Sequence, residues 1–351
     1  MESKEIKEFG FQLGYSKVGI TSADGFPDYV KEVESRGDEF SILSFTTTNP
    51  LKDAHPKIKM PDAKSIIVLV YDYFKYDYPE ELTKMIGKAY LGRCYGPQPG
   101  TINYARLQLM KDYLSENGCK VDSSIGLPAR WAGAQAGVTT FGRNNFAYAE
   151  GCGSYIIIST IVVDKELEYD EPTMECKCPP NCRMCIDACP MQAIYEPFHL
   201  NPKKCISFNN WMTQAGREPI SIHIPNEVRE KLGCHIHGCD ICQDVCPRNH
   251  AKRQMPKKMD PFIEAIAKDI TLPNILHMTE EFYKKRINPI MYNYIKDKRY
   301  FQRNAAIAMG NLEDEAFILD LEMELNNPDE MIRDAVEWAL QKIKVKNKVF
   351  D

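Results

Sequence analysis

Ten of the thirteen cysteines lie between residues 176 and 246, and their spacing is the most informative feature of the chain. Two runs there have the same form, Cys-x3-Cys-Pro: one begins at Cys185 and ends at Pro190, and the other begins at Cys242 and ends at Pro247. Closely spaced thiolates are ligands for iron and zinc, and the proline directs the chain away after the last cysteine. The pattern therefore predicts two neighbouring metal centres.

A repeated Cys-x3-Cys-Pro ending is typical of bacterial ferredoxins, in which the last cysteine of each run binds the other cluster. We therefore predict two 4Fe–4S clusters. One would be bound by Cys178, Cys182, Cys185 and Cys246. The other would be bound by Cys189, Cys205, Cys239 and Cys242. Because the spacing from Cys178 to Cys182 is x3 rather than the usual x2, Cys176 could replace Cys178, and Cys234 is left over.

Zinc sites and disulfides account for these cysteines less well. Structural zinc favours paired Cys-x2-Cys knuckles with four ligands per ion, which does not account for a repeated x3-Cys-Pro ending. Disulfides would require an oxidising compartment. The start of the chain has neither the apolar core of a signal peptide nor a twin arginine, so we expect a reducing cytoplasm.

The length of 351 residues predicts two or three domains, and the composition, with a net charge of −5, is that of an ordinary soluble protein. We place a ligand-binding domain at 1–170, a double-cluster domain at 171–255 and a helical domain at 256–351. Apolar runs such as 65–70 and 155–163 are too short to cross a bilayer.

The first domain alternates helical patterns with apolar strands, which predicts an α/β or α+β fold. The continuous β-branched run at 65–70 indicates a strand that is buried on both faces. Helices are predicted at 3–13 and 102–117, strands at 16–21, 63–74 and 154–163, and a loop at 92–101.

Two glycine-rich segments, 136–146 and 151–154, lie between the second predicted helix and the last strand. Glycines allow the backbone to approach a bulky ligand, and Arg143, Asn144 and Asn145 offer polar anchors. A turn-rich connector accounts for the same residues. The chain has no dinucleotide fingerprint and no phosphate-binding loop.

The pattern from residue 260 onwards is helical, and it contains two similar segments thirty residues apart, 303–311 and 333–341. This spacing indicates stacked helical hairpins of HEAT type, although a plain helical cap fits two copies equally well.

Basic residues with interleaved tyrosines form a stripe between residues 248 and 303. A positive, aromatic-bearing stripe on an acidic protein suits a polyanion such as RNA, although many basic helix faces are only solvated surface. The basic members are Arg248, Lys252, Arg253, Lys257, Lys258, Lys284, Lys285, Arg286, Lys296, Lys298, Arg299 and Arg303, and the tyrosines are Tyr283, Tyr292, Tyr294 and Tyr300.

Several of these segments, taken in order, resemble the epoxyqueuosine reductases, which are iron–sulfur and cobalamin-dependent enzymes related in architecture to reductive dehalogenases. The matching segments are 187–194, 205–207, 224–228, 238–249 and 303–311, preceded by 121–123 and 136–144. The resemblance implies a nitroreductase-like first domain, a ferredoxin-like second domain and a HEAT-like end that helps to hold tRNA. It also implies an external low-potential electron donor of flavodoxin or ferredoxin type.

The resemblance further implies particular site residues. Asp122 stands where the family carries its proton-donating aspartate, and a carboxylic acid with a raised pKa suits that role. The competing interpretation is a surface aspartate that caps a turn. Tyr95 is a second donor candidate. The corrinoid would contact Gly142, Arg143, Asn144, Gly153 and Ser154. Because the chain lacks an Asp-x-His-x-x-Gly motif, base-off cobalamin is expected.

The chain departs from the family where substrate binds. The segment 139–144 replaces Gly-Trp-x-Gly-Lys-Asn, and 92–98 stands near the place of the Arg-Asp-Tyr-His segment of tRNA-acting members. Two alternatives to an epoxyqueuosine reductase therefore stay open. One is a corrinoid reductase of a small organic molecule, such as a reductive dehalogenase. The other is a ferredoxin-like electron carrier or corrinoid-reactivating partner.

Overall fold

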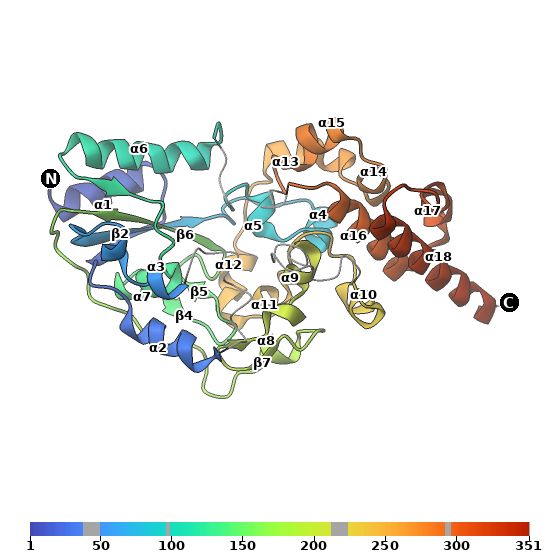
Figure 1. The fold of residues 1–351 in the computed structure, drawn as a ribbon, viewed down its shortest axis with the longest axis horizontal. Helices are drawn as coiled ribbons and strands as arrows, with labels where there is room; N and C mark the ends of the chain where they lie inside the picture. Colours follow the sequence, from blue (N-terminus) through green and yellow to red (C-terminus); the bar gives the residue numbers. More distant parts are fainter. Residues whose placement is uncertain (38–49, 96–98, 212–223, 292–295, 351) are drawn as a thin grey trace.

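The first part of the protein is a four-stranded antiparallel sheet with helices on both faces (Figure 1). The computed structural model describes residues 1–37, 50–95, 99–211, 224–291 and 296–350. The strand order is β1-β2-β6-β3. The strands are β1 Lys17–Ser22, β2 Ser65–Asp72, β3 Val121–Asp122 and β6 Ile156–Val163.

The β-branched run of β2 is buried on both faces, as its sequence predicts. Alternate residues contribute to opposite layers, since Ile67 and Leu69 pack with α1 and α6, whereas Ile66 and Val68 pack with α7. Every strand pair is antiparallel, so the sheet is of the α+β kind and not the parallel α/β kind. The helices around it are α1 Ser3–Gln12, α2 Pro27–Ser35, α3 Pro50–Asp53, α6 Ile102–Glu116 and α7 Ala129–Gln135.

A small hairpin joins the sheet to the cysteine segment. It consists of β4 Thr140–Phe141 and β5 Ala147–Tyr148, paired antiparallel. The cysteine segment has little regular structure: its elements are α8 Met184–Asp187, β7 Ile194–Glu196, β8 His199–Leu200, α9 Ile206–Trp211, α10 Asn226–Leu232, α11 Ile241–Asp244 and α12 His250–Gln254. Two short helices, α4 Glu80–Met85 and α5 Lys88–Leu91, pack beside it.

The C-terminal part is helical, and its long helices α16 Arg299–Leu312 and α18 Glu330–Phe350 pack together (Figure 1). The two similar segments of the sequence therefore lie side by side on neighbouring helices, while their assignment as HEAT repeats stays a prediction. The other helices are α13 Pro261–Ile266, α14 Leu272–Leu276, α15 Glu280–Phe282 and α17 Ile318–Met323, with a π-helical turn at Tyr283–Ile287.

One hydrophobic core runs through the cysteine segment and the C-terminal helices. Ile206 and Ile236 belong to the same buried cluster as Phe301 and Ala305. The predicted boundary at residue 255 therefore crosses a shared core, and the domain limits stay predictions. Among the described helices, none combines the length and the hydropathy that crossing a membrane requires.

Candidate functional site

Two short helices, α8 and α11, each carry the first cysteine of a Cys-x3-Cys-Pro run, and the two helices pack together. Proline disfavours helical backbone in the residue before it, and Cys246 has extended dihedral angles, φ −72° and ψ 124°. The chain therefore leaves the α11 direction at Cys246. This change of direction places the last cysteine of the second run beside the thiols of the first run.

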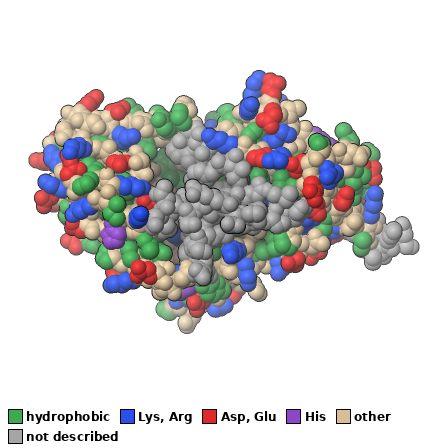
Figure 2. Space-filling view, viewed as in Figure 1, with side chains coloured by type: hydrophobic (Ala, Val, Ile, Leu, Met, Phe, Trp, Pro, Cys, Tyr) green, Lys and Arg blue, Asp and Glu red, His purple; other side chains and the backbone are tan. Residues whose placement is uncertain are grey.

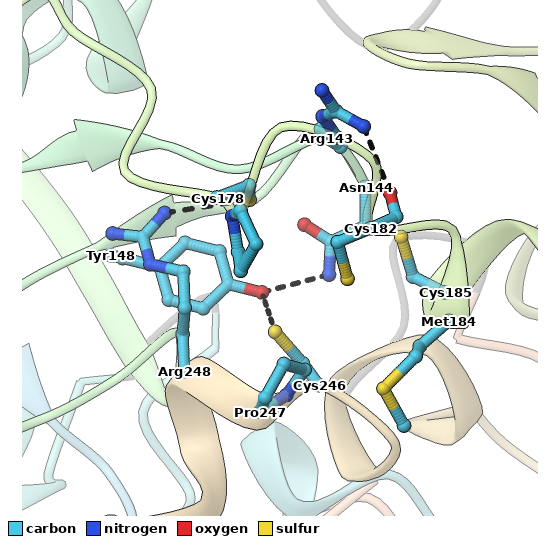
Figure 3. A pocket seen from close by; sticks show the side chains of 11 residues that line it. Arg143, Asn144, Tyr148, Cys178, Cys182, Met184, Cys185, Cys246, Pro247 and Arg248 are labelled. Atoms are coloured by element: carbon cyan, nitrogen blue, oxygen red, sulfur yellow. Dashed lines mark hydrogen bonds between the residues drawn. The ribbon is translucent and has the colours of Figure 1, made fainter.

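Four cysteines line one pocket: Cys178, Cys182, Cys185 and Cys246 (Figure 3). They are the set predicted to bind one cluster, with three members from residues 178–185 and one, Cys246, from the end of the second run. Burial raises the pKa of the Cys185 thiol to about 11, and three thiols of the same pocket raise it further: Cys246, Cys178 and Cys182. The four side chains therefore line a common space.

The other predicted set also gathers in one place. Burial raises the pKa of Cys239, and the nearby thiols of Cys205 and Cys189 raise it further. The pKa of Cys242 is raised by burial first and then by Cys239 and Cys205. Within the described residues, no three His, Cys, Asp or Glu side chains converge tightly enough to bind a single metal ion.

The two cysteines that the sequence left open have different surroundings. Cys178 lines the first pocket, whereas Cys176 is exposed beside it. Cys234 is half-buried; burial raises the pKa of its thiol, and the Lys84 ammonium opposes this shift. Of the two candidates, Cys178 is therefore the one that lines the pocket.

Arg143 and Asn144, predicted to contact a corrinoid, connect the β4–β5 hairpin to the cysteine loops. Arg143 Nη1 donates a hydrogen bond to the Cys182 carbonyl at 3.0 Å, and Nη2 donates to the Pro180 carbonyl. Asn144 Nδ2 donates to the Cys242 carbonyl at 3.2 Å. Gly142 lies against the Tyr148 ring, where a Cβ atom would be 2.3 Å from a ring carbon. These residues line the thiol pocket or support it.

Gly153 and Ser154 contact Gln243 and Asn249, which lie within and just after the second cysteine run. Gly153 has a positive φ of +64°, and a Cβ atom there would be 2.3 Å from Asn249 Oδ1. The Ser154 hydroxyl donates to Gln243 Oε1 at 2.8 Å, while its backbone N–H donates to Asn249 Oδ1 at 2.9 Å. Sequence reasoning missed Gln243 and Asn249, although both belong to the 238–249 segment that carries the family resemblance.

A second, larger cavity of about 650 Å³ lies on the other side of the hairpin. Its volume is within the range of small-molecule sites. The β4–β5 hairpin separates the two spaces: Asn144 and Tyr148 line the thiol pocket, while Phe146 and Ala147 line the cavity. The remaining lining residues are Cys94, Tyr95, Leu107, Ser123, Ile125, Gly126, Leu127, Ala129, Arg130, Ser154, Ile156, Ile157, Ile158, Ser159 and Thr160.

The two candidate proton donors are placed differently at this cavity. Tyr95 lines it, with its ring edge-on to Tyr90 at 5.2 Å between centroids. Asp122 is half-buried on β3, next to Ser123 of the cavity wall. Its Oδ1 accepts hydrogen bonds from the backbone N–H and the hydroxyl of Ser124, both at 2.7 Å. Asp122 is therefore one residue away from the cavity wall in sequence, and its carboxylate holds a turn.

The predicted basic stripe is not a continuous surface. Lys252 is buried in an ion pair with Asp72, and Arg303 is buried, with Nη2 3.2 Å from the carbonyl oxygens of Asn209 and Asn210. The prediction that these two side chains face a partner is wrong, because both stabilise the interior. Exposed members are Arg253, Lys258, Lys284, Lys285, Arg286, Lys296 and Arg299. Tyr292 and Tyr294 lie outside the described residues, and Tyr283 and Tyr300 are buried.

Opposite charges are mixed on the surface. Lys285 pairs with Glu281, and Arg299 pairs with Asp297 and Asp329. On the face drawn in Figure 2, basic and acidic side chains alternate over the described residues.

Residues 177–249, which hold both thiol sets, match the family model of a 4Fe-4S double cluster binding domain. The resemblance to the epoxyqueuosine reductases is confirmed over nearly the whole chain. The enzyme of Bacillus subtilis (strain 168) is 29% identical over 350 residues, which cover 97% of this chain and 87% of that protein.

Solved structures give the same result. An epoxyqueuosine reductase crystallised with a tRNA-Tyr epoxyqueuosine-modified tRNA stem loop matches with a TM-score of 0.82 and 26% identity, over 97% of this chain and 89% of that one. A Bacillus subtilis epoxyqueuosine reductase, solved with an aspartate-containing catalytic loop swung out of the active site, also has a TM-score of 0.82, at 26% identity, with 97% and 90% covered.

Proposed function

We propose that this chain is an iron–sulfur reductase that removes the epoxide oxygen from epoxyqueuosine in tRNA. The observation that carries the proposal is the agreement with epoxyqueuosine reductases over 97% of the chain, in both sequence and fold. Agreement of that extent includes the cavity and the hairpin as well as the cysteine segment, so it supports more than a shared electron-transfer module.

The two thiol sets are the proposed cluster sites. A 4Fe–4S cluster needs four thiolates around a common space, and Cys178, Cys182, Cys185 and Cys246 surround one pocket. The second cluster would take Cys189, Cys205, Cys239 and Cys242. Because α8 and α11 pack together, the clusters would be neighbours and would pass electrons singly from an external low-potential donor towards the cavity.

The cavity of about 650 Å³ is the proposed site of a base-off cobalamin. Its fit is supported by a wall of aliphatic and small residues from β6, against which a flat macrocycle can lie. When bound, cobalamin supplies the metal centre that performs the reductive chemistry. Ser154 and Phe146 would contact it, while Gly142, Arg143, Asn144 and Gly153 would support the wall.

Opening the epoxide consumes protons as well as electrons, because the oxygen leaves as water. Asp122 is the proposed donor, since its neighbour Ser123 lines the cavity and the comparable enzyme of Bacillus subtilis has an aspartate-containing catalytic loop that moves. To reach the substrate, the carboxylate would exchange its Ser124 contacts for a substrate contact. Tyr95, already in the cavity wall, is the second candidate donor.

Binding of tRNA would use the exposed basic residues near the cavity and the C-terminal helices. Phosphate contacts from lysine and arginine supply most of such affinity and make it depend on salt. The crystallised relative with a tRNA stem loop supports this part of the proposal.

A corrinoid-dependent reductase of a small organic molecule is the second candidate function. The positions of the basic residues favour this second function, because Lys252 and Arg303 are buried and Arg299 forms ion pairs with two aspartates. These three residues are therefore less available to bind tRNA. In that case the aliphatic cavity would bind a small substrate directly.

Anaerobic turnover of tRNA carrying epoxyqueuosine tests the proposal. The chain is reconstituted with iron and sulfide, supplied with cobalamin and a low-potential reductant, and the nucleosides are analysed by mass spectrometry. We expect about eight iron atoms per chain (two cubes of four) and conversion to queuosine. Turnover of a halogenated organic compound but not of tRNA would favour the second candidate. Clusters without corrinoid binding would identify an electron carrier.

A further inference from the structure

Tyr148 makes a direct hydrogen bond to one of the pocket thiols. Its hydroxyl donates to Cys246 Sγ at 3.1 Å, and the phenol is buried, with 3% of the residue exposed (Figure 3). Asn144 Nδ2 donates to the same phenol oxygen at 2.9 Å. Because that oxygen already accepts a hydrogen bond from an amide, its own proton is directed at the sulfur. The Asn144 amide therefore makes the Tyr148 hydroxyl the donor, and Cys246 Sγ the acceptor, in the bond between them.

Arg248 holds a positive charge against the same ring. Its guanidinium carbon is 3.9 Å from the Tyr148 ring centroid, which is cation–π geometry. Nη1 also lies 3.9 Å from Cys178 Sγ. The guanidinium is fixed by two further bonds, from Nη1 to the Phe141 carbonyl at 2.8 Å and from Nη2 to Thr140 Oγ1 at 2.6 Å. Two thiols of the first pocket therefore have such a neighbour: Cys246 accepts a hydrogen bond from Tyr148, and Cys178 lies beside the Arg248 guanidinium.

We infer that Tyr148 and Arg248 raise the reduction potential of the cluster in the first pocket. The inference rests on the proposed clusters. Reduction adds negative charge that is shared with the cysteine sulfurs, and a hydrogen bond or a nearby cation stabilises that charge. Both residues act through the ligands Cys246 and Cys178, so they are positioning residues. Since the hairpin that carries Tyr148 also lines the cavity, the affected cluster would be the one beside the proposed corrinoid site.

A purely structural role for Tyr148 would have a different signature. Replacement by phenylalanine retains the buried ring and its contact with Arg248, and it removes only the donor to sulfur. If Tyr148 merely packs, the cluster potential would stay where it is. If the hydrogen bond sets the potential, only this cluster should change.

Redox titration of the full-length, anaerobically reconstituted chain tests the inference, with EPR and visible absorption as readouts and no added corrinoid or substrate. For Tyr148→Phe we expect one of the two midpoint potentials to become more negative, with about a tenfold change in the equilibrium constant (about 59 mV for one electron), while the other stays fixed. Arg248→Gln should move the same potential in the same direction. Fluorotyrosine at position 148, a stronger donor with the same shape, should move it the opposite way.

Tyr169→Phe is the matched control, because the Tyr169 hydroxyl donates to the Lys64 carbonyl at 3.0 Å, outside the cysteine segment. It should leave both potentials unchanged. Iron content must match the wild-type chain in each variant, and if Tyr148→Phe loses iron, the fluorotyrosine titration decides. Unmoved potentials, or shifts in the wrong direction, in chains with intact clusters would overturn the inference alone. A wild-type chain without clusters would overturn the proposed function as well.

Discussion

Asn249 and Ser154 are joined by a reciprocal pair of hydrogen bonds: the Ser154 backbone N–H donates to Asn249 Oδ1 at 2.9 Å, and Asn249 Nδ2 donates to the Ser154 hydroxyl at 2.8 Å. Asn249 Nδ2 also donates to the Gln243 carbonyl at 2.8 Å. All three residues are buried. This amide therefore connects the end of the second cysteine run to the strand that forms the cavity wall.

Asn249→Ala should destabilise the protein by about 3 kcal/mol, because it leaves several buried polar groups without partners. Urea unfolding of the apoprotein measures this loss. Asn274→Ala is the control, since that exposed amide donates only to the Asp269 carbonyl, and it should cost less than about 1 kcal/mol. Equal losses for the two variants would contradict the role given to Asn249.

The buried ion pair of Lys252 and Asp72, 2.5 Å between Nζ and Oδ2, should show strong coupling. Lys252→Met or Asp72→Asn alone leaves one buried charge or polar group unmatched and should cost about 3–5 kcal/mol. The double variant should recover most of this loss. Denaturant unfolding in a double-mutant cycle measures the coupling, and the solvent-exposed pair Lys84–Glu80 is the reference, for which little coupling is expected. Additive losses at Lys252 and Asp72 would argue against the pair.

Asp122→Asn should lower turnover by about 10²–10⁴-fold, because the amide cannot supply a proton while its oxygen can still hold the Ser124 turn. Iron content and unfolding should match the wild-type chain. Asp112→Asn, on the exposed side of α6, should leave turnover unchanged. Full activity in Asp122→Asn would transfer the donor role to Tyr95 or to water.

Removing positive charges from the C-terminal part should affect tRNA binding at exposed residues and the stability of the fold at buried ones. Lys284→Ala with Lys285→Ala should weaken tRNA binding and reduce the slope of log affinity against log salt by about 0.7 for each phosphate that is no longer neutralised. Arg303→Met should instead destabilise the fold by about 3 kcal/mol and leave binding by the folded fraction intact. Salt titrations of tRNA binding and denaturant curves distinguish them. A steep loss of affinity in folded Arg303→Met would place that residue at the interface after all.

Stability should fall at high pH partly because of Tyr15. Burial raises the pKa of Tyr15 to about 12, with the Arg106 guanidinium opposing the shift. Between about pH 10 and pH 12 the unfolded chain loses this proton while the folded chain keeps it, so stability decreases as pH rises. Tyr15→Phe has no ionisable group at this position, so its free energy of unfolding should lack this decrease. Relative to the wild-type chain, the variant should therefore gain up to about 2 kcal/mol of stability across that window. Parallel stability–pH curves for the two chains would contradict this.

Local patterns in the sequence predicted the elements well where burial or ligand chemistry dictates residue type. The run at 65–70 is buried on both faces, and a helix was expected close to the bounds of α6. The antiparallel order was not predictable from that run, because continuous apolar strands are more typical of parallel sheets. The cysteine spacing predicted two thiol sets, and the structure brings those same sets together.

Contacts between distant segments were not predictable. Tyr148 contacts Cys246, and Asn249 contacts Ser154, only because the hairpin and the cysteine segment pack together. Local periodicity in the sequence does not indicate which distant residues are paired. For the same reason the polar character of Arg143 and Asn144 was evident, but their partners were not. The prediction of an exposed basic stripe was wrong for Lys252 and Arg303, because the charge of a residue does not indicate which side of a helix is buried.

The make-up of the first thiol pocket also bears on how the protein matures. Three of its cysteines precede residue 190, but the fourth is Cys246, so a nascent chain on the ribosome cannot close this pocket until the second run has emerged. Cofactor insertion would then follow synthesis of the whole cysteine segment, and fragments that end before Cys246 should stay unable to retain iron in this pocket.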